Sequence, residues 1–217
     1  MSDVLVIDTG SANLRSMLTA LERLGSRPRF ACDRTEIVDA PHVVLPGVGT
    51  YAAAMRRIRD DDLEAALRDR ILRGQPTLCV CVGLQILCSC SEESPGAPGL
   101  GIVDLQIRSF SARVRVPHMG WNRVVPAAGS AYVEAGHAYF ANSYRLPADA
   151  ESSSWLQRYG WRWSTADYAG SFVAACERGA VLACQFHPEL SGSWGSSLLR
   201  RWLETSAQAC TGEVGSC

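Results

Sequence analysis

The 217-residue chain lacks several features that would each assign it to a class at once. It has no apolar run that approaches the roughly 20 residues needed to span a membrane. Its net charge is only −1 at pH 7, so neither nucleic acid nor an anionic membrane surface is expected as a partner. Its start lacks the charged and apolar regions and the cleavage site of a secretory leader. We therefore expect a cytoplasmic protein that binds no nucleic acid and no membrane.

Cysteine pairs of the form Cys-x-x-Cys are also missing, although the chain has nine cysteines. So many cysteines in an extracellular protein would suggest disulfide bridges, but an odd number leaves one unpaired. Several stand in apolar strand or helix patterns, where cysteine behaves as a small buried hydrophobic residue: Cys79, Cys81, Cys88, Cys176 and Cys184. We expect no metal ion and no other cofactor.

The order of apolar segments indicates one α/β domain at residues 1–204, followed by a small, polar tail at 205–217 that we expect to be frayed. In the first 90 residues strands alternate with amphipathic helices, a pattern typical of a parallel sheet. There we expect strands at 4–8, 29–31, 43–45 and 78–82, and helices at 11–24, 51–58, 63–72 and beyond Cys81. Shorter, turn-separated strands are expected at 101–125 and 138–176, then a last strand at 181–186 and a closing helix at 194–203.

The run Cys79-Val80-Cys81-Val82-Gly83 leaves an apolar segment and turns on a glycine. A thiol at a strand-to-helix turn lies at the positive end of the helix dipole, which favours the thiolate. This turn is the cysteine counterpart of the nucleophile elbow of hydrolases, where the residues two before and two after the nucleophile must be small. Only Cys81 meets that condition, with Cys79 before it and Gly83 after it. The alternative is an ordinary buried strand.

A second apolar strand runs into His187-Pro188-Glu189. A cysteine nucleophile needs a base, and the base needs an acceptor on its other ring nitrogen. Because Pro188 favours an extended conformation at His187, the side chains of His187 and Glu189 are expected on the same side of the chain. We predict His187 as the base and Glu189 as the residue that orients it; taken alone, such a histidine is more often structural.

A third strand ends in a glycine-flanked turn, and glycine permits backbone conformations in which N–H groups point at a ligand. A tetrahedral oxyanion needs such preorganised donors. The predicted oxyanion donors are the N–H of Val82 and one from the turn formed by Gly47, Val48 and Gly49. The alternative is an ordinary turn between a strand and a helix.

These motifs together resemble the class I, or triad, glutamine amidotransferases. Three further stretches are similar to the glutaminase subunits of imidazole glycerol phosphate synthases: residues 8–14, Pro-His-Met-Gly-Trp-Asn at 117–122 and Gln-Phe-His-Pro-Glu at 185–189. The similarity runs from about residue 4 to residue 204. It implies a three-layer α/β fold with a mostly parallel central sheet and a smaller antiparallel strand region.

The resemblance implies a reaction, a pocket and a partner. Glutamine would be hydrolysed to glutamate through a thioester on Cys81, and the ammonia delivered to a (β/α)8 cyclase subunit, bound as a heterodimer, for histidine biosynthesis. The implied substrate-binding residues are Gln85, Glu93, Asn142, Ser143 and Tyr144. The implied partner interface contains His118, Trp121, Asn122 and Tyr139. Without the resemblance, Glu93 would pass for a solvated loop charge and Trp121 for a packing residue.

Two positions depart from the family's pattern, and two other functions stay open. Cys79 stands where the family usually has a glycine, and Asn142 where it usually has a histidine. Asn142 leaves the triad intact but affects a segment between the implied pocket and the implied partner. The alternatives are a glutaminase subunit that serves another synthase, such as one for surface-sugar amination, and an inactive interaction protein that has kept the fold.

Overall fold

The computed structural model describes residues 2–8, 14–31, 33–47 and 49–205. Three expectations lie outside these ranges. They concern the start of the first helix at residues 11–13, Val48 of the predicted oxyanion turn, and the tail from residue 206 onward.

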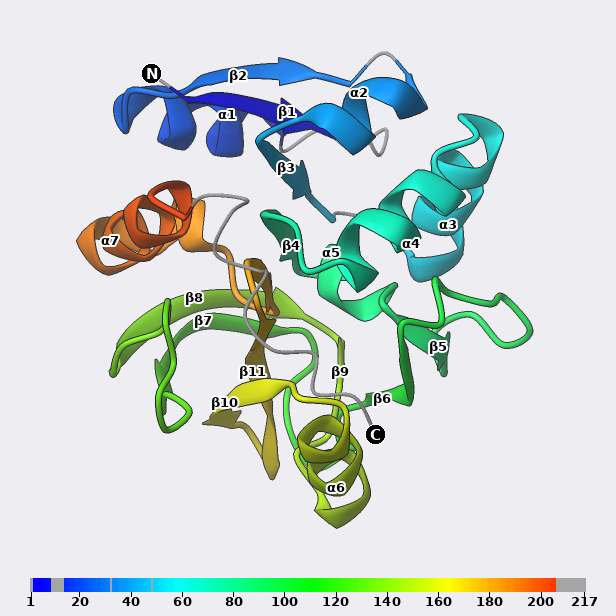
Figure 1. Ribbon diagram of the computed structural model, residues 1–217. Coiled ribbons are helices and arrows are strands. Elements are labelled where there is room, and N and C mark those ends of the chain that lie inside the picture. Colours follow the sequence, from blue (N-terminus) through cyan, green and yellow to red (C-terminus); the bar gives the residue numbers. More distant parts are fainter. Residues whose placement is uncertain (1, 9–13, 32, 48, 206–217) are drawn as a thin grey trace.

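The central sheet has seven strands in the order β10-β11-β12-β4-β3-β1-β2 (Figure 1). Five are parallel to one another: β1 (Asp3–Val6), β2 (Arg27–Phe30), β3 (His42–Leu45), β4 (Thr77–Val80) and β12 (Val181–Cys184). Strands β10 (Arg162–Asp167) and β11 (Ser171–Arg178) extend the sheet in antiparallel pairing. The expected mostly parallel sheet is confirmed.

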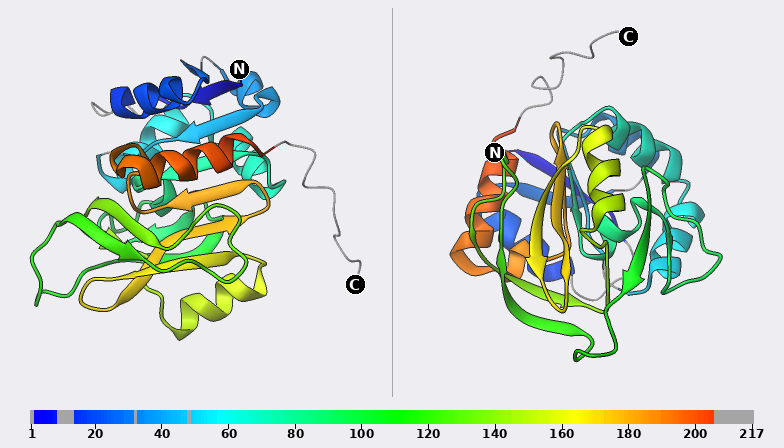
Figure 2. Two further views of the ribbon diagram at one scale, coloured as in Figure 1. Left: turned by 90° about the vertical axis from the view of Figure 1, so that its left-hand side faces the viewer. Right: turned by 90° about the horizontal axis from the view of Figure 1, so that it is seen from below.

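Helices cover both faces of this sheet, which gives the expected three layers. Helices α1 (Leu14–Arg23) and α7 (Gly192–Leu203) lie on one face, as both figures show (Figures 1 and 2). Helices α2 (Arg34–Asp39), α3 (Tyr51–Asp60) and α4 (Glu64–Leu72) lie on the other (Figure 1). In α1 the apolar stripe of Leu14, Met17 and Leu21 is buried, as helical spacing requires.

The middle of the chain forms the smaller strand region. Strands β7 (His118–Val124) and β8 (Gly136–Asn142) form an antiparallel two-stranded ribbon. Strands β5 (Cys88–Ser91), β6 (Val103–Ser109) and β9 (Tyr144–Arg145) form a three-stranded sheet in the order β5-β6-β9. Helix α6 (Ala150–Arg158) packs against β6 and β10.

Helix α6 corrects the expectation of strands throughout residues 138–176. Its sequence is rich in serine and weakly apolar, so periodicity gave little signal. The helix instead begins at a capping residue, because the Asp149 side chain accepts a hydrogen bond from the Ser152 N–H at 2.9 Å. Helix α2 begins the same way, at Asp33, and was not expected from the sequence.

The helix after Cys81 is only one turn long, α5 (Val82–Gln85), and strand β5 follows it. A helix beyond Cys81 is thus present as expected, and it is short. All of its residues are buried, so apolar residues here mark the core and not one face of a helix.

Three adjacent strands bring the predicted site together. Strand β4 lies between β12 and β3, and all residues of the three strands are buried. In the parallel register Cys184 lies beside Val80, and Leu45 lies beside Cys79. The loops that carry Cys81, His187 and Gly47 therefore leave the same edge of the sheet at the same level, where α/β proteins place their ligands.

A buried guanidinium fixes the opposite ends of these strands. Arg70 of α4 is 1% exposed and donates to the carbonyl oxygens of Ile37 and Pro76, each at 2.8 Å, and to the Thr77 hydroxyl at 3.2 Å. Burial lowers the pKa of Arg70 to about 10, which leaves it charged at neutral pH. One side chain thus ties α4 to the segments that precede β3 and β4.

Replacing this side chain tests how strongly it holds the sheet. Arg70→Met leaves buried carbonyl groups unpaired, so we expect the free energy of unfolding to fall by about 3 kcal/mol. The matched control is Arg73→Met on the same helix, whose ion pair with Asp69 is exposed and should contribute under about 1 kcal/mol. Urea unfolding followed by circular dichroism gives both values; equal losses would contradict the role of Arg70.

Candidate active site

Cys81 occupies a strained turn at the end of β4. Its φ of 56° and ψ of −109° lie in a region that a non-glycine residue adopts only when its surroundings impose it. The Cys81 N–H donates to the Cys184 carbonyl oxygen at 2.7 Å, which holds the turn against β12. This is the strand-to-helix elbow that the sequence predicts.

Two glycines make the elbow possible by letting backbones touch. A Cβ atom added at Gly83 would overlap the Leu45 carbonyl oxygen, and one added at Gly47 would overlap the backbone of Val82 and Gly83. The turns after β3 and β4 are therefore in direct backbone contact. Small residues at these positions are a steric requirement of the site, as expected for Gly83.

The neighbouring thiol of Cys79 is not placed for catalysis. Cys79 is 0% exposed, and burial strongly raises the pKa of its thiol, so it stays protonated at neutral pH. Its Cβ lies 3.6 Å from the position that a Gly83 Cβ would take. Cysteine is thus small enough for the position two before Cys81, and Cys81 is the thiol that lines a pocket.

His187 and Glu189 form the expected pair. The Nδ1 atom of His187 lies 2.9 Å from Oε1 of Glu189, and their side chains are only 6% and 5% exposed. The backbone of His187 is held by Tyr139, whose carbonyl oxygen accepts its N–H at 2.9 Å, and by Ser191, whose hydroxyl donates to its carbonyl oxygen at 2.7 Å. The other ring nitrogen, Nε2, then remains available to exchange a proton with the thiol.

The electrostatics of this pair favour a charged imidazole. Burial acts to lower the pKa of His187, but hydrogen bonds with Cys81 and Glu189 outweigh it and raise the pKa to about 10. The charged ring is stabilised by its hydrogen bonds with the sulfur of Cys81 and the carboxyl group of Glu189. His187 is therefore charged at neutral pH and lies beside the thiol.

The predicted oxyanion donor points at a carbonyl group. The Val82 N–H lies 3.4 Å from the Gly47 carbonyl oxygen, which occupies the direction that an oxyanion would take. Gly49 lines the same pocket, with a φ of 97° that glycine adopts readily. The turn after β3 is thus next to Cys81 as expected, and its Gly47 carbonyl oxygen faces the Val82 N–H.

A cavity of about 400 Å³ opens beside Cys81 and His187. All five residues expected to bind substrate line it: Gln85, Glu93, Asn142, Ser143 and Tyr144. Oε2 of Glu93 accepts the Tyr51 N–H at the start of α3 at 2.6 Å, which fixes this carboxylate at the rim. An anionic group there suits the α-ammonium group of an amino acid.

Asn142, one of the two departures from the family's pattern, supports the pocket wall. Its side-chain amide donates to the Tyr144 carbonyl oxygen at 2.9 Å, and the same carbonyl accepts the Gln85 amide at 3.0 Å. Asn142 therefore acts on the backbone that lines the pocket. Sequence reasoning overlooked a third amide, Gln185, which is fully buried beside Cys81; it lies inside the Gln-Phe-His-Pro-Glu motif.

The four residues expected at a partner interface divide into two groups. His118 is 4% exposed and stacks on Tyr168 with ring centroids 4.1 Å apart, so it belongs to the core. Asn122 donates to the Asp167 carbonyl oxygen at 2.8 Å. Trp121, in contrast, is 57% exposed and contacts the edge of Tyr139, which borders the cavity. Of these four residues, Tyr139 lines the cavity and Trp121 packs against it.

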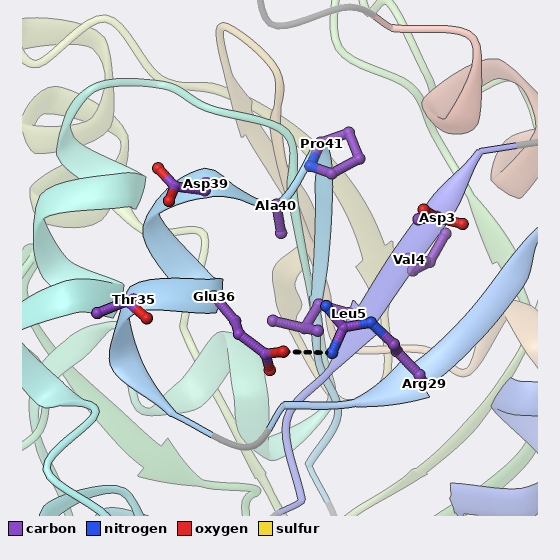
Figure 3. Close-up of a pocket in the computed structure, with 9 residues that line it drawn as sticks. All are labelled: Asp3, Val4, Leu5, Arg29, Thr35, Glu36, Asp39, Ala40 and Pro41. Carbon is purple, nitrogen blue, oxygen red and sulfur yellow. Dashed lines mark hydrogen bonds and ion pairs between the residues drawn. The ribbon is translucent and has the colours of Figure 1, made fainter.

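A second hollow of about 300 Å³ lies between α2 and strands β1 and β2 (Figure 3). Its lining includes Asp3, Glu36 and Asp39 but no nucleophile. Its one guanidinium, Arg29, pairs with Glu36 at 2.6 Å. Among the described residues, no three His, Cys, Asp or Glu side chains gather as metal ligands would. We therefore place the candidate site at Cys81.

The titration of His187 tests the electrostatic account. Because its pKa is raised above the ordinary 6.5, its charge stabilises the folded state below that pH, and this contribution is lost as pH rises toward 10. We expect Glu189→Gln and Cys81→Ala each to lower the midpoint in an NMR titration of the ring. An unchanged His187 midpoint in both variants would contradict the account.

Comparisons with known proteins agree with this geometry. The chain is 37% identical over 206 residues to a Pectobacterium atrosepticum protein named imidazole glycerol phosphate synthase subunit HisH, which covers 93% of this chain and 98% of that one. It is also 37% identical to the Arabidopsis thaliana protein named imidazole glycerol phosphate synthase hisHF, chloroplastic, over 96% of this chain and 35% of that one.

A solved structure titled as a glutamine amidotransferase shares the fold, with a TM-score of 0.71 at 21% identity over 93% of this chain and 97% of that one. The sequence profile of the family described as glutamine amidotransferase class-I matches residues 5–205. The chain therefore belongs to the class I glutamine amidotransferase family.

Proposed function

We propose that this protein is the glutaminase subunit of an imidazole glycerol phosphate synthase and supplies ammonia for histidine biosynthesis. The observation that carries the proposal is Cys81 at a positive-φ elbow with the His187 and Glu189 pair beside it, in one cavity. The names of the bacterial relatives, which match over nearly their whole length, support the choice of synthase. Residues 1–204 would act as a single glutaminase domain in the cytoplasm.

The chemistry follows from these positions. The Cys81 thiolate attacks the side-chain amide carbon of glutamine, and the developing oxyanion is stabilised by the Val82 N–H and a second N–H from the turn after β3. His187 gives its proton to the departing ammonia. Water activated by the neutral imidazole then hydrolyses the thioester and releases glutamate. Glu93 at the rim is proposed to hold the α-ammonium group of glutamine.

Partner binding would switch this site on. With the Gly47 carbonyl oxygen 3.4 Å from the Val82 N–H, the unbound subunit lacks a complete oxyanion site and should hydrolyse glutamine slowly. A partner that turns this carbonyl away would ensure that ammonia is released only when the partner can use it. The plant relative, whose name joins two subunit labels and of which this chain covers only 35%, supports a cyclase as that partner.

The β7 and β8 ribbon is the proposed docking surface for a (β/α)8 cyclase subunit. Along β7 the residues alternate, so that Met119 and Trp121 are 64% and 57% exposed while His118 faces the core. Met119 and Tyr139 also line the cavity of Cys81. Large exposed apolar side chains that continue into an active site are typical of interface hot spots. Ammonia could then leave the site directly into the bound partner.

A glutaminase assay tests the proposal. The purified chain alone should release glutamate slowly, and addition of the cyclase subunit from the same organism with its ligand should raise the rate at least tenfold. Cys81→Ala should abolish the activity, while Cys90→Ala, which removes an exposed thiol away from the cavity, should retain it. Full activity in Cys81→Ala would refute the mechanism, and failure to restore growth of a histidine auxotroph lacking this subunit would point to another synthase.

Trp121 tests the docking surface separately. Trp121→Ala should weaken binding of the cyclase subunit about 30-fold, because buried aromatic anchors at interfaces contribute roughly 2 kcal/mol or more. The matched control is Leu72→Ala, which removes a 51% exposed apolar side chain at the end of α4. Calorimetry of the two variants should separate them. An equal effect of both substitutions would indicate that the interface lies elsewhere on the protein.

A further inference from the structure

Gln185 carries a buried amide that contacts the reacting sulfur and has no role in the mechanism above. We propose that Gln185 is a further catalytic residue, whose side-chain N–H holds the Cys81 thiolate in position for attack. The proposal rests on the function proposed above, since it assigns a role within the same reaction. The proposal rests on the position of one hydrogen-bond donor and on the hydrogen-bond network that orients this donor.

The donor is within reach of the sulfur. Nε2 of Gln185 lies 3.5 Å from Sγ of Cys81, a normal distance for a hydrogen bond to sulfur, and both residues are buried. The backbone N–H of Gln185 donates to the Ala174 carbonyl oxygen at 2.8 Å, which continues the contact between β12 and β11 beyond Cys184. Gln185 stands one residue beyond the end of β12, and this hydrogen bond holds its backbone against β11.

A second glutamine decides which way this amide points. Oε1 of Gln185 accepts a hydrogen bond from Nε2 of Gln85 at 3.0 Å, so its nitrogen must face the sulfur. The other proton of the Gln85 amide goes to the Tyr144 carbonyl oxygen, also at 3.0 Å. Both donors of Gln85 are thus used, and Gln85 cannot accept from Gln185 in this arrangement.

The same carbonyl connects the network to the pocket wall. Tyr144 accepts from Asn142 as well as from Gln85, and all three residues line the cavity of Cys81. A chain of amides therefore runs from the wall of the substrate pocket to the nucleophile. This chain of amides has a chemical use. A thiolate that lies between His187 and an amide N–H is stabilised by both donors, and its lone pairs are oriented toward the cavity.

The proposed role differs from simple packing in its dependence on pH. Removing the N–H destabilises the thiolate but not the thiol, so the loss should vanish once the medium is alkaline enough to ionise Cys81 unaided. The other titratable groups around the sulfur are His187, Glu189 and the Cys184 thiol, and Glu93, Tyr139 and Tyr144 line the same cavity. They are unchanged in Gln185 variants, so a difference between proteins reports on Gln185.

Alkylation of Cys81 by iodoacetamide measures this effect without glutamine turnover. Mass spectrometry assigns the label to Cys81 and separates it from the exposed Cys90. In Gln185→Met, which has similar volume and no donor, we expect alkylation of Cys81 at pH 7 to slow about tenfold and the midpoint of the pH profile to rise by about one unit. At pH values above that midpoint the rate should return to that of the native chain.

Two further variants serve as comparisons for Gln185→Met. Gln185→Glu keeps an acceptor for Gln85 but places a carboxylate at the sulfur, so it should slow alkylation about a hundredfold at pH 7. Gln106→Met, a glutamine exposed on β6, is the matched control and should leave the profile unchanged. An unshifted midpoint in Gln185→Met, or a loss of equal size at every pH, would overturn the proposal.

A measurement on the native chain covers the case in which the Gln185 variants fail to fold. The side-chain NH2 resonances of Gln185 should shift with pH as Cys81 ionises and should lose that step in Cys81→Ala; a step that persists in Cys81→Ala would overturn the proposal. If the shifted profile is found while the chain and its cyclase release no glutamate, the assignment of Gln185 stands and the proposed function fails.

Discussion

The site depends on one steric constraint, the backbone contact between the turns that follow β3 and β4. Because Gly47 and Gly83 have no side chains, the two turns approach until a single added carbon at either would overlap the other's backbone. That approach holds Cys81 in a conformation with positive φ at the positive end of α5. It also places the possible oxyanion donors against the nucleophile. The surrounding sheet, fixed at its far end by Arg70, supplies the rigidity that this strained turn requires.

The site combines an imidazole that is already charged with an oxyanion site that is not yet formed. Hydrogen bonds to Cys81 and Glu189 raise the pKa of His187 against the effect of burial, which favours the charged imidazole at rest. The Gly47 carbonyl oxygen meanwhile faces the Val82 N–H. Under the proposed activation by a partner, turning one peptide group would complete the site, which is a smaller change than building a nucleophile.

The sequence was informative where steric demands are local and specific. The small residues around Cys81, the spacing of His187 and Glu189, and the glycine turn after β3 each limit the backbone to few conformations. The structure adds that their strands are adjacent in the sheet. Helices α2 and α6 were missed because capping residues, not apolar periodicity, define where they begin. The burial of His118 and the contact of Gln185 with Cys81 depend on side chains from distant strands, which no local pattern encodes.

The central claim is that Cys81, and no other thiol, forms a covalent bond to the glutamine carbon. The most direct test is to incubate the chain and its cyclase subunit with an electrophilic glutamine analogue and to locate the label by mass spectrometry. We predict stoichiometric labelling of Cys81, strongly accelerated by the partner and prevented by excess glutamine. Labelling of Cys79 or Cys184 in place of Cys81, or no labelling in the complex, would contradict the account.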